Sequence, residues 1–452
     1  MACAVPVHAS LRSVGASVQR PRLRTCDLGL PRPFRCGYVL VPVRRADPSL
    51  GTTKVAFAVR TRSNRGRPSL GTIVAMDGGP GYASTDAPFA RSLVAVMAPL
   101  LRRHDLVLFD ERGTGRSDVI DCAPLQRGLA PEAIAVGECA NQLGPRYSGY
   151  TTAEAARDLE VVRQTLGLGR VFLYGDSYGT LFGQAYAARY PASLRGLILD
   201  SAYPADDPYY RTLLPAGLKG LRIACRDSPA CAGDPVARFA RVVHRFHGAD
   251  RSTEGLLDFL LQAGTLAPRS YLGLDEADSR FLAGDRRRLE QLIAPGPAGH
   301  GELSEFSYGL EVAVTCNDYP LLWDPRAGID ERIRQLSAAV SRLPKDYFAP
   351  FGRREYLLSS AAHLTSCLTW PPPPSGLEPP LPAGWRASTA FPTLILAGQV
   401  DDITSVAEAR QVRRRFPQSS LFVVRDRGHA SSLYFPFRSP GVGAIRHFIA
   451  SN

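Results

Sequence analysis

Short runs of apolar residues alternate along most of the chain with segments whose apolar positions recur at helical spacing. Such runs are typical of buried strands, and their alternation with amphipathic helices predicts an α/β fold with a mostly parallel sheet and helices on both faces. The predicted strands are Tyr38–Val43, Lys54–Val59, Thr72–Met76, Leu106–Phe109, Val171–Tyr174, Gly196–Leu199, Thr393–Ala397 and Leu421–Val424.

Several segments between these strands have helical periodicity. In Thr152–Leu166 apolar side chains recur every three or four residues, a threonine can cap the start, and Gly167 ends the pattern. Tyr178–Arg189, Ser405–Arg415 and Val442–Ala450 are the other helices that the pattern predicts.

The alternation of strands and helices stops at about Pro204 and resumes at about Ala390. This stretch is rich in helical patterns and ends in the proline cluster Pro371–Pro382. We interpret it as an insertion between two strands of one sheet, with the proline-rich part as a stiff return linker. The sequence thus predicts a core in two parts, 1–203 and 391–452, and an inserted helical lid over 204–390.

Composition excludes several classes of protein. With 452 residues, 45% of them apolar and 21% charged, the chain can bury a large core. No apolar run reaches the ~18 residues of a membrane helix. The net charge of +12 comes from 54 basic residues, nearly all arginine, that are spread along the chain. A nucleic-acid-binding protein would gather them on one element, so we expect solvated helix faces and no nucleic-acid partner.

The nine cysteines bear on the cellular compartment. The absence of any C-x-x-C pair argues against zinc ribbons and thioredoxin chemistry. Apart from Cys3, the eight cysteines can be grouped into pairs that are neighbours along the chain. This grouping favours disulfides and an oxidising compartment, and the alternative is buried free thiols in a cytosolic enzyme. Met1–Arg20 lacks the apolar core and basic start of a signal peptide. A misplaced start codon, another export route and retention in the cell are the three interpretations.

The sharpest motif is the stretch from Gly175 to Gly179, which reads G-D-S-Y-G. It has the form G-x-S-x-G, follows a predicted strand and precedes a predicted helix, which is the context of a nucleophile elbow. The glycines are needed because the turn is so tight that side chains there would collide. The turn lifts the Ser177 hydroxyl away from the sheet, and the helix N-terminus points at the reacting carbonyl. We therefore predict that Ser177 is a nucleophile.

A serine hydroxyl needs a base, and in hydrolases with this elbow the chain order is serine, acid, histidine. His429 follows the last predicted strand, at the sheet edge where the base must lie, whereas His447 lies within a helix and suits a surface or packing role. Asp401 or Asp402 can orient the imidazole by a hydrogen bond, and the other can cap the helix that follows.

An oxyanion hole requires backbone N–H groups near the serine. The loop Asp77–Gly81, after the third predicted strand, is glycine-rich and allows such an approach. We predict the N–H groups of Gly79 and Tyr178 as the pair. A phosphate-binding loop is excluded because no G-K-S/T follows. The stretch Asp110–Ser117 is better explained as a tight turn held by an Arg112 ion pair than as a second ligand loop.

Five segments resemble, in order and spacing, the proline iminopeptidase and tripeptidyl aminopeptidase group of α/β-hydrolases. They are Asp77–Gly81, Asp110–Ser117, Gly175–Gly179, Gly398–Thr404 and Gly428–His429. The chain looks most like the secreted actinobacterial branch with a TAP-like C-terminal region, from about Thr25 onward. The resemblance implies an α/β-hydrolase fold with an inserted helical lid. The family's G-x-x-D-x-x-T pattern falls on Gly398, Asp401 and Thr404, so the resemblance selects Asp401 as the acid.

The stretches Val314–Asp318 and Cys367–Pro371 also resemble the family, whose lid cysteines are usually paired. This supports disulfides and a secreted or cell-envelope location. The predicted pairs are Cys26–Cys36, Cys122–Cys139, Cys225–Cys231 and Cys316–Cys367.

The sequence departs from the family pattern at three positions. Asp77 stands where a histidine is common, and Asp402 and Ser405 replace prolines often seen beside the acid. These departures affect the expected substrate preference more than the mechanism.

The resemblance implies a serine hydrolase that cleaves peptides from the free N-terminus, and we expect a monomer that uses no metal or organic cofactor. An exopeptidase must bind the substrate's ammonium group, which requires carboxylates near the site. The candidates in the lid are Glu302, Glu305, Glu311 and Asp318, and a solvated lid charge is the alternative interpretation of each. A carboxylesterase with an acyl pocket under the lid is the rival in the same class. A catalytically inactive binding module is the rival in another class, and an intact Ser, Asp and His argue against it.

Overall fold

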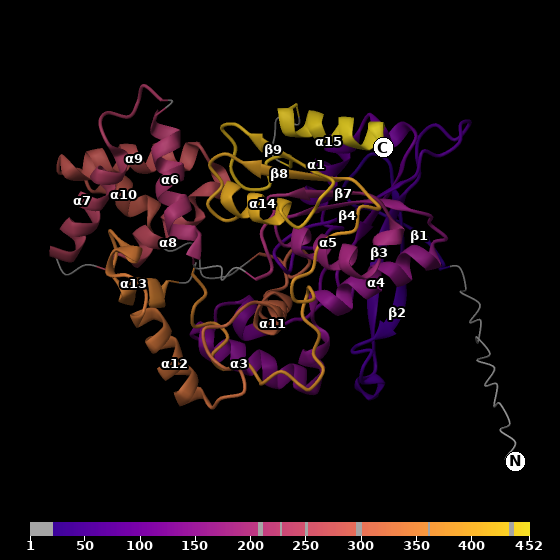
Figure 1. Cartoon of the computed structure of the whole chain (residues 1–452), viewed down its shortest axis with the longest axis horizontal. Helices are drawn as coiled ribbons and strands as arrows, with labels where there is room; N and C mark the ends of the chain where they lie inside the picture. Colours follow the sequence, from indigo (N-terminus) through magenta and orange to yellow (C-terminus); the bar gives the residue numbers. More distant parts are fainter. Residues whose placement is uncertain are drawn as a thin grey trace, which may run out of the picture.

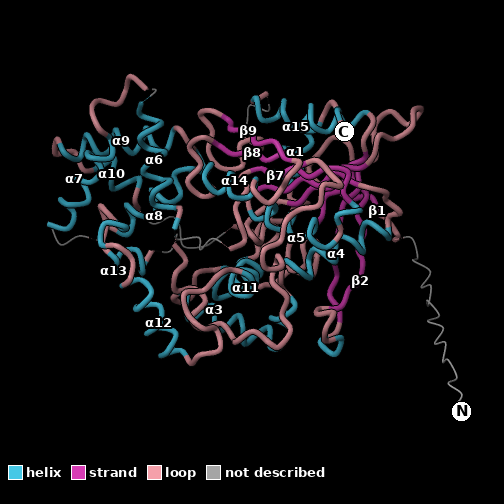
Figure 2. The backbone as a smooth tube through the Cα atoms, viewed as in Figure 1, coloured by secondary structure: helices cyan, strands magenta, loops and turns pink. Residues whose placement is uncertain are grey.

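The computed structural model describes residues 21–206, 211–226, 228–248, 252–294, 301–359, 362–433 and 438–452. Among these residues nine strands form one sheet in the order β1-β2-β3-β5-β4-β6-β7-β8-β9 (Figure 2). They are β1 (Arg24–Cys26), β2 (Phe34–Pro42), β3 (Thr52–Arg60), β4 (Thr72–Met76), β5 (Asp105–Phe109), β6 (Val171–Asp176), β7 (Leu194–Asp200), β8 (Thr393–Gly398) and β9 (Ser419–Val424). From β5 to β9 every neighbouring pair is parallel.

Each of the eight predicted strands overlaps an observed strand. The short β1 was not predicted, because its sequence Arg-Thr-Cys has no apolar run. It exists because it pairs with the start of β2, which therefore begins at Phe34, before the predicted start.

Helices cover both faces of the sheet, as the alternating pattern predicts (Figure 1). α1 (Ala87–Met97) and α15 (Pro440–Ser451) pack on one face, and α4 (Thr152–Thr165), α5 (Tyr178–Arg189) and α14 (Val406–Arg413) pack on the other. Side chains of β4 alternate between the two cores, because successive residues of a strand point to opposite faces. All five residues of β4 are buried, as expected for a central parallel strand.

A long helical segment leaves the sheet after β7 and returns at β8, although these two strands are neighbours. Its helices are α6 (Leu213–Arg226), α7 (Pro235–Gly248), α8 (Glu254–Gln262), α9 (Arg269–Leu282), α10 (Arg287–Leu292), α11 (Tyr308–Asp318), α12 (Ile329–Ser341) and α13 (Arg353–Leu358). Figure 1 shows α6 to α10 gathered beside the sheet. We propose that 204–390 acts as a lid domain.

A second helical segment, inserted after β5, packs against the lid. α2 (Ala123–Gln126) and α3 (Glu132–Leu143) follow β5, and both contact α11 of the lid. The sequence analysis did not predict these helices. No helix among the described residues is long and apolar enough to cross a membrane.

Four disulfides join neighbouring cysteines along the chain. They are Cys26–Cys36, Cys122–Cys139, Cys225–Cys231 and Cys316–Cys367. The last one links α11 to the segment after α13 and closes a loop of 51 residues. Cys3 lies outside the described residues, as does the whole of Met1–Arg20.

The loop lengths predict unequal contributions of these bonds to stability. Replacing Cys316 and Cys367 by serine should lower the free energy of unfolding by about 4 kcal/mol. Without the cross-link the unfolded chain gains conformational entropy, and this gain increases with the length of the loop. Replacing Cys225 and Cys231, which are 6 residues apart, should cost about 2 kcal/mol. Urea unfolding of both double variants measures the difference. Equal losses would contradict the chain-entropy argument.

Candidate active site

Ser177 lies between β6 and α5 in the left-handed backbone region, with φ of 50°. A non-glycine residue there costs about 1–3 kcal/mol and must be held by its surroundings. Its N–H donates to the carbonyl of Asp200 at 2.9 Å. A Cβ added to Gly175 would lie 2.1 Å from the carbonyl oxygen of Gly179, and one added to Gly179 would lie 2.9 Å from that of Met76. The glycines are thus a steric requirement of the turn.

Asp401 and His429 form a hydrogen-bonded pair in the loops after β8 and β9. Nδ1 of His429 lies 3.2 Å from Oδ1 and 3.1 Å from Oδ2 of Asp401. Asp401 also accepts hydrogen bonds from the N–H groups of Ile403 and Thr404 and from the Thr404 hydroxyl. With Nδ1 engaged, Nε2 of His429 is the nitrogen that can accept a proton.

The structure contains no hydrogen bond between the Ser177 hydroxyl and His429, both of which are described residues. Such bonds are often long before substrate binds and shorten in the complex. The two side chains come from loops at the same edge of the sheet, since β6, β8 and β9 are parallel.

Asp402 points to the lid and not to the histidine. Its Oδ1 accepts from the N–H of Gly264 at 2.8 Å, and its Oδ2 accepts from the hydroxyl of Tyr271 on α9 at 2.9 Å. The sequence analysis expected one of the two aspartates to cap the next helix, and this is wrong. Ser405 caps α14 and forms a reciprocal capping box with Glu408, because its hydroxyl is the group placed at the N-cap.

Ser201 is a contact of the acid that the sequence analysis missed. Its hydroxyl donates to Oδ2 of Asp401 at 2.9 Å and accepts from the N–H of Ala430 at 2.8 Å. It directly follows β7, which lies between β6 and β8. A polar residue at the end of a predicted central strand was the available signal.

The charges around His429 favour its protonated form. Burial by itself lowers the pKa of the imidazole, but the carboxylate of Asp401, with Asp200 and Asp402 further away, outweighs it and raises the pKa above 6.5. A histidine that acts as a base must be neutral. The arrangement therefore predicts activity that falls as the pH drops through this raised pKa.

The glycine loop after β4 packs directly against the elbow. A Cβ added to Gly78 would lie 2.7 Å from Cβ of Ser177. Gly79 has a φ of 111° and lines the same cavity as Ser177. Tyr178 is the first residue of α5, so its N–H has no partner inside the helix. The structure thus places the loop that carries Gly79 next to the turn that carries Tyr178, the two residues whose N–H groups are predicted to form the oxyanion hole.

Two acidic side chains join this loop to the elbow. The carboxyl groups of Asp77 and Asp176 hydrogen-bond to each other, and Oδ1 of Asp77 accepts from the N–H of Gly78 at 2.7 Å. Burial raises the pKa of both groups, and for Asp176 the charge of Asp77 adds to the effect. Both shifts favour a protonated carboxyl at this contact between the two loops. Neither side chain was assigned a role from the sequence.

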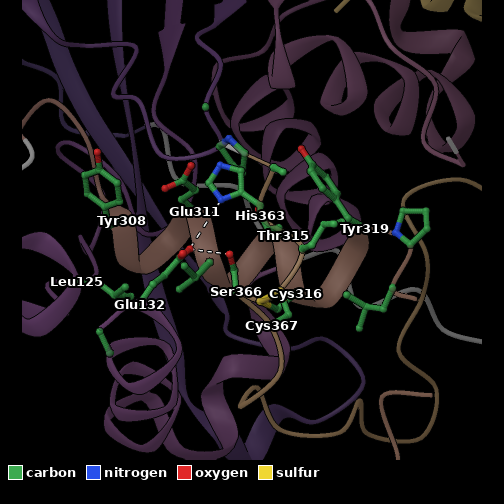
Figure 3. A pocket seen from close by; sticks show the side chains of 18 of the residues that line it. Leu125, Glu132, Tyr308, Glu311, Thr315, Cys316, Tyr319, His363, Ser366 and Cys367 are labelled. Atoms are coloured by element: carbon green, nitrogen blue, oxygen red, sulfur yellow. Dashed lines mark hydrogen bonds and ion pairs between the residues drawn. A yellow bond between two sulfur atoms is a disulfide. The ribbon is translucent and has the colours of Figure 1, made fainter. Parts of the chain in front are cut away.

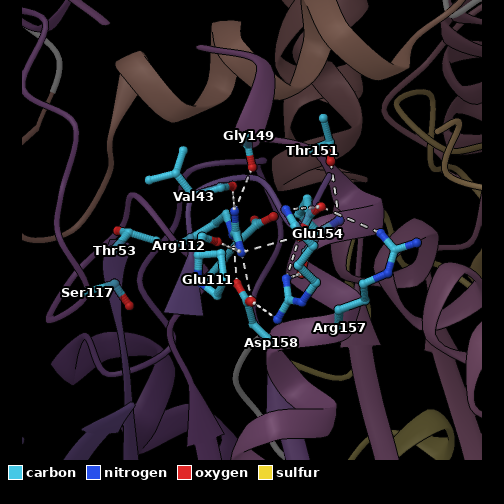
Figure 4. A network of polar contacts seen from close by, with 12 residues as sticks. Val43, Thr53, Glu111, Arg112, Ser117, Gly149, Thr151, Glu154, Arg157 and Asp158 are labelled. Carbon is cyan, nitrogen blue, oxygen red and sulfur yellow. Dashed lines mark hydrogen bonds and ion pairs between the residues drawn. The ribbon is translucent and has the colours of Figure 1, made fainter. Parts of the chain in front are cut away.

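A buried ion pair fixes the turn that precedes α2 (Figure 4). The guanidinium of Arg112 binds both carboxylate oxygens of Asp158 on α4, at 2.6 and 2.7 Å, and donates to the carbonyls of Val43 and Gly149. This matches the expected turn held by an Arg112 ion pair. The preceding residue, Glu111, accepts a hydrogen bond from the hydroxyl of Tyr178 at 2.9 Å. The ion pair thereby supports the first turn of α5.

A cavity of about 470 Å³ opens onto Ser177 between the core and the lid. Its size suits a small ligand. Gly79, Ser177 and Thr404 line one part of it. Elsewhere α3, α11 and the segment after α13 supply Glu132, Glu311, His363 and the disulfide Cys316–Cys367 (Figure 3). Aromatic side chains complete the wall, namely Tyr203, Tyr308, Tyr319 and Trp323.

The four acidic residues considered for amine binding lie in different places. Glu311 lines the cavity, and burial raises its pKa to about 7. Glu302 and Glu305 are exposed and do not line it. Asp318 is not among the lining residues and accepts from the N–H of Thr152 at 2.6 Å.

Glu132 also lines the cavity, and the sequence analysis did not consider it. It comes from α3, outside the predicted lid, and no local pattern marks it.

A serine on a strained strand-to-helix turn, with a histidine–aspartate pair at the same edge of a parallel sheet, has the layout of a serine hydrolase site. The family model described as "alpha/beta hydrolase fold" matches residues 71–436. The chain belongs to this family.

Three known proteins show the type of enzyme. A "Tripeptidyl aminopeptidase" of Streptomyces coelicolor is 27% identical over 448 residues, which cover 89% of this chain and 78% of that protein. "Serine protease Hip1" of Mycobacterium tuberculosis is 27% identical, over 83% of this chain and 78% of its own. "Carboxylesterase B" of the same species is 28% identical, over 78% and 73%. The chain is accordingly an enzyme of the serine hydrolase class.

The elbow predicts one reactive serine. A serine-directed phosphonate or sulfonyl fluoride should label Ser177, and Ser177→Ala should lower kcat by a factor on the order of 10⁴–10⁶ while the fold persists. Peptide mapping and circular dichroism provide the measurements. Labelling of another serine, or near-normal turnover of the variant, would refute the assignment.

The different partners of Asp401 and Asp402 predict unequal effects of the same substitution. Asp401→Asn should lower kcat by about 10⁴-fold, because the imidazole loses the carboxylate that holds its tautomer. Asp402→Asn, the matched control, removes a contact with the lid and should change kcat less than about tenfold. Steady-state kinetics on a small ester compare them. A larger effect at Asp402 would reverse the assignment of the acid.

Proposed function

We propose that this enzyme removes short peptides from the free N-terminus of its substrates, in the manner of a tripeptidyl or prolyl aminopeptidase. The observation that carries the proposal is a single cavity in which Ser177 and the two carboxylates Glu132 and Glu311 face the same space. The relatives named as an aminopeptidase and a serine protease point in the same direction.

The proposed chemistry is acyl transfer through a Ser177–His429–Asp401 triad. Ser177 Oγ attacks the scissile carbonyl carbon while Nε2 of His429 takes its proton. The N–H groups of Gly79 and Tyr178 stabilise the oxyanion that forms. His429 then gives the proton to the leaving amine, and an acyl-enzyme remains. Water, activated by the same histidine, releases the peptide, and Asp401 holds the imidazole throughout.

The acidic part of the cavity is the proposed site for the substrate's α-ammonium. Glu132 and Glu311 lie where water is partly excluded, so an ion pair with an ammonium is stronger there than on the surface. The lid and the α2–α3 segment cover the site, which admits a chain end more easily than the middle of a folded protein. The peptide that the enzyme releases is the part of the substrate between its α-ammonium, bound at Glu132 and Glu311, and the scissile bond at Ser177.

Carboxylesterase activity is the second candidate function. The aromatic and aliphatic lining of the cavity, with Leu321, Leu322 and Trp323, suits an acyl chain, and one relative is named a carboxylesterase. Carboxylates that line a cavity have no partner on a neutral ester, so the peptidase is favoured.

The proposed place of action is outside the cytoplasm, secreted or associated with the cell envelope. Four disulfides support it, because such bonds persist in oxidising compartments.

The amine anchor predicts discrimination between free and blocked peptides. Acetylating a good tripeptide substrate should lower kcat/KM by about tenfold or more, roughly the value of one charged hydrogen bond. Glu311→Gln should erase this difference while hydrolysis of a small neutral ester stays nearly intact. Glu302→Gln, an exposed lid residue, is the matched control and should keep the discrimination. If the wild type cuts free and blocked peptides equally well, the carboxylesterase becomes the leading function.

The pKa of Glu311 also predicts how this discrimination depends on pH. The ratio of kcat/KM for free over blocked peptide should fall as the pH drops below about 7, because the carboxylate gains a proton. It should also fall above about pH 8, where the α-amine loses its charge. Using the ratio cancels the titration of His429, which acts on both substrates. A ratio that is constant from pH 5.5 to 9 would contradict the anchor; these limits bracket the two pKa values by roughly one unit.

A further inference from the structure

His363 lies in the cavity beside both acidic residues of the proposed amine site (Figure 3). Its Nδ1 is 3.7 Å from Oε1 of Glu132. The same carboxylate oxygen accepts a hydrogen bond from the Ser366 hydroxyl at 2.6 Å. Glu311, in the first turn of α11, interacts with the imidazole through its charge. The chain thus places its own titratable cation where a substrate's ammonium would bind.

The segment that carries this imidazole is fixed to α11 and α3. His363 has a φ of 50°, in the left-handed region that histidine adopts more readily than most residues. Four residues later, Cys367 is bonded to Cys316 on α11. Ser366, between them, is tied to Glu132 on α3. The imidazole is therefore a built part of the cavity wall.

We propose that His363 is an internal counter-ion that competes with the substrate's α-ammonium for Glu132 and Glu311, so that its protonation state sets the preference for free N-termini. This inference rests on the proposed aminopeptidase function. When His363 is protonated, its charge cancels one carboxylate and repels an incoming ammonium. When it is neutral, both carboxylates are available to the substrate.

The charged groups around His363 support this role. The imidazole is 39% exposed, and its partial loss of water by itself lowers its pKa. The ion pair with Glu132 and the charges of Glu311 and Asp258 outweigh this effect and raise the pKa above the ordinary 6.5. These acidic groups come from three elements, α3, α11 and α8. In return, the imidazolium lowers the pKa of Glu311, which burial and Glu132 raise. The site is thus arranged to hold a cation in the absence of substrate.

The test places a permanent cation at this position. His363→Lys and His363→Arg carry a charge that does not titrate near neutral pH, and His363→Gln is neutral and similar in size. The substrates are a free and an acetylated tripeptide anilide and a small acyl ester, at pH 7.5, a value chosen because the α-amine keeps much of its charge below about pH 8. The matched control is His247→Lys, because His247 also pairs with a glutamate, Glu355 at 2.7 Å, but does not line the cavity.

We expect both cationic variants to lose the preference for the free peptide by about tenfold or more, because a like charge at an ammonium site is costly. The loss should appear in KM for the free peptide, and it should be larger than any change in ester hydrolysis. His363→Gln and His247→Lys should keep the preference. A merely structural role would impair the neutral and cationic variants alike and would also affect the ester.

Two outcomes would overturn the inference alone. One is a cationic variant that still prefers the free peptide, and the other is a loss of preference in His363→Gln equal to that in the cationic variants. If the wild type itself shows no preference, the proposed function fails, and this inference fails with it. Ester turnover and the midpoint of thermal unfolding verify that each variant is folded. If His363→Lys does not fold, His363→Arg provides the same test.

Discussion

The close packing of backbone around Ser177 is the constraint on which the rest of the site depends. The loop after β4, the elbow after β6 and the first turn of α5 approach so closely that Gly78, Gly175 and Gly179 leave no room for a Cβ. This packing holds the serine in a left-handed conformation and brings the glycine loop against it. The buried carboxyl groups of Asp77 and Asp176 lie across the same contact, and burial raises the pKa of both.

The loop after β8 connects this rigid centre to the lid. Adjacent aspartates point in opposite directions, since Asp401 holds His429 while Asp402 binds Gly264 and Tyr271. The N–H of His429 itself donates to the carbonyl of Gly264 at 2.9 Å. The lid is therefore joined to the loops that carry Asp401 and His429, at the sheet edge where Ser177 also lies.

Local patterns were sufficient for the core of the fold and for the turn that carries Ser177. Buried strands have continuous apolar runs, and the glycines of the elbow are required by sterics that act within five residues. The resemblance to a known family then selected Asp401 over its neighbour. Glu132, Ser201 and His363 were missed because their roles arise only when distant segments meet. The cap of α14 was misassigned because two aspartates and a serine stood near the helix start, and the sequence alone did not show which one the loop would place there.

The disulfide Cys316–Cys367 is part of the wall of the cavity that opens onto Ser177, and it also cross-links the lid. It joins the helix that carries Glu311 to the segment that carries His363 and Ser366. The loops that hold Ser177, Asp401 and His429 contain none of the eight paired cysteines. The proposed catalytic loops are thus positioned without a cross-link, whereas the proposed amine site includes one. If the proposed function holds, a chain in a reducing environment lacks the bond between the segments of Glu311 and His363, and the cell compartment takes part in defining what the enzyme can recognise.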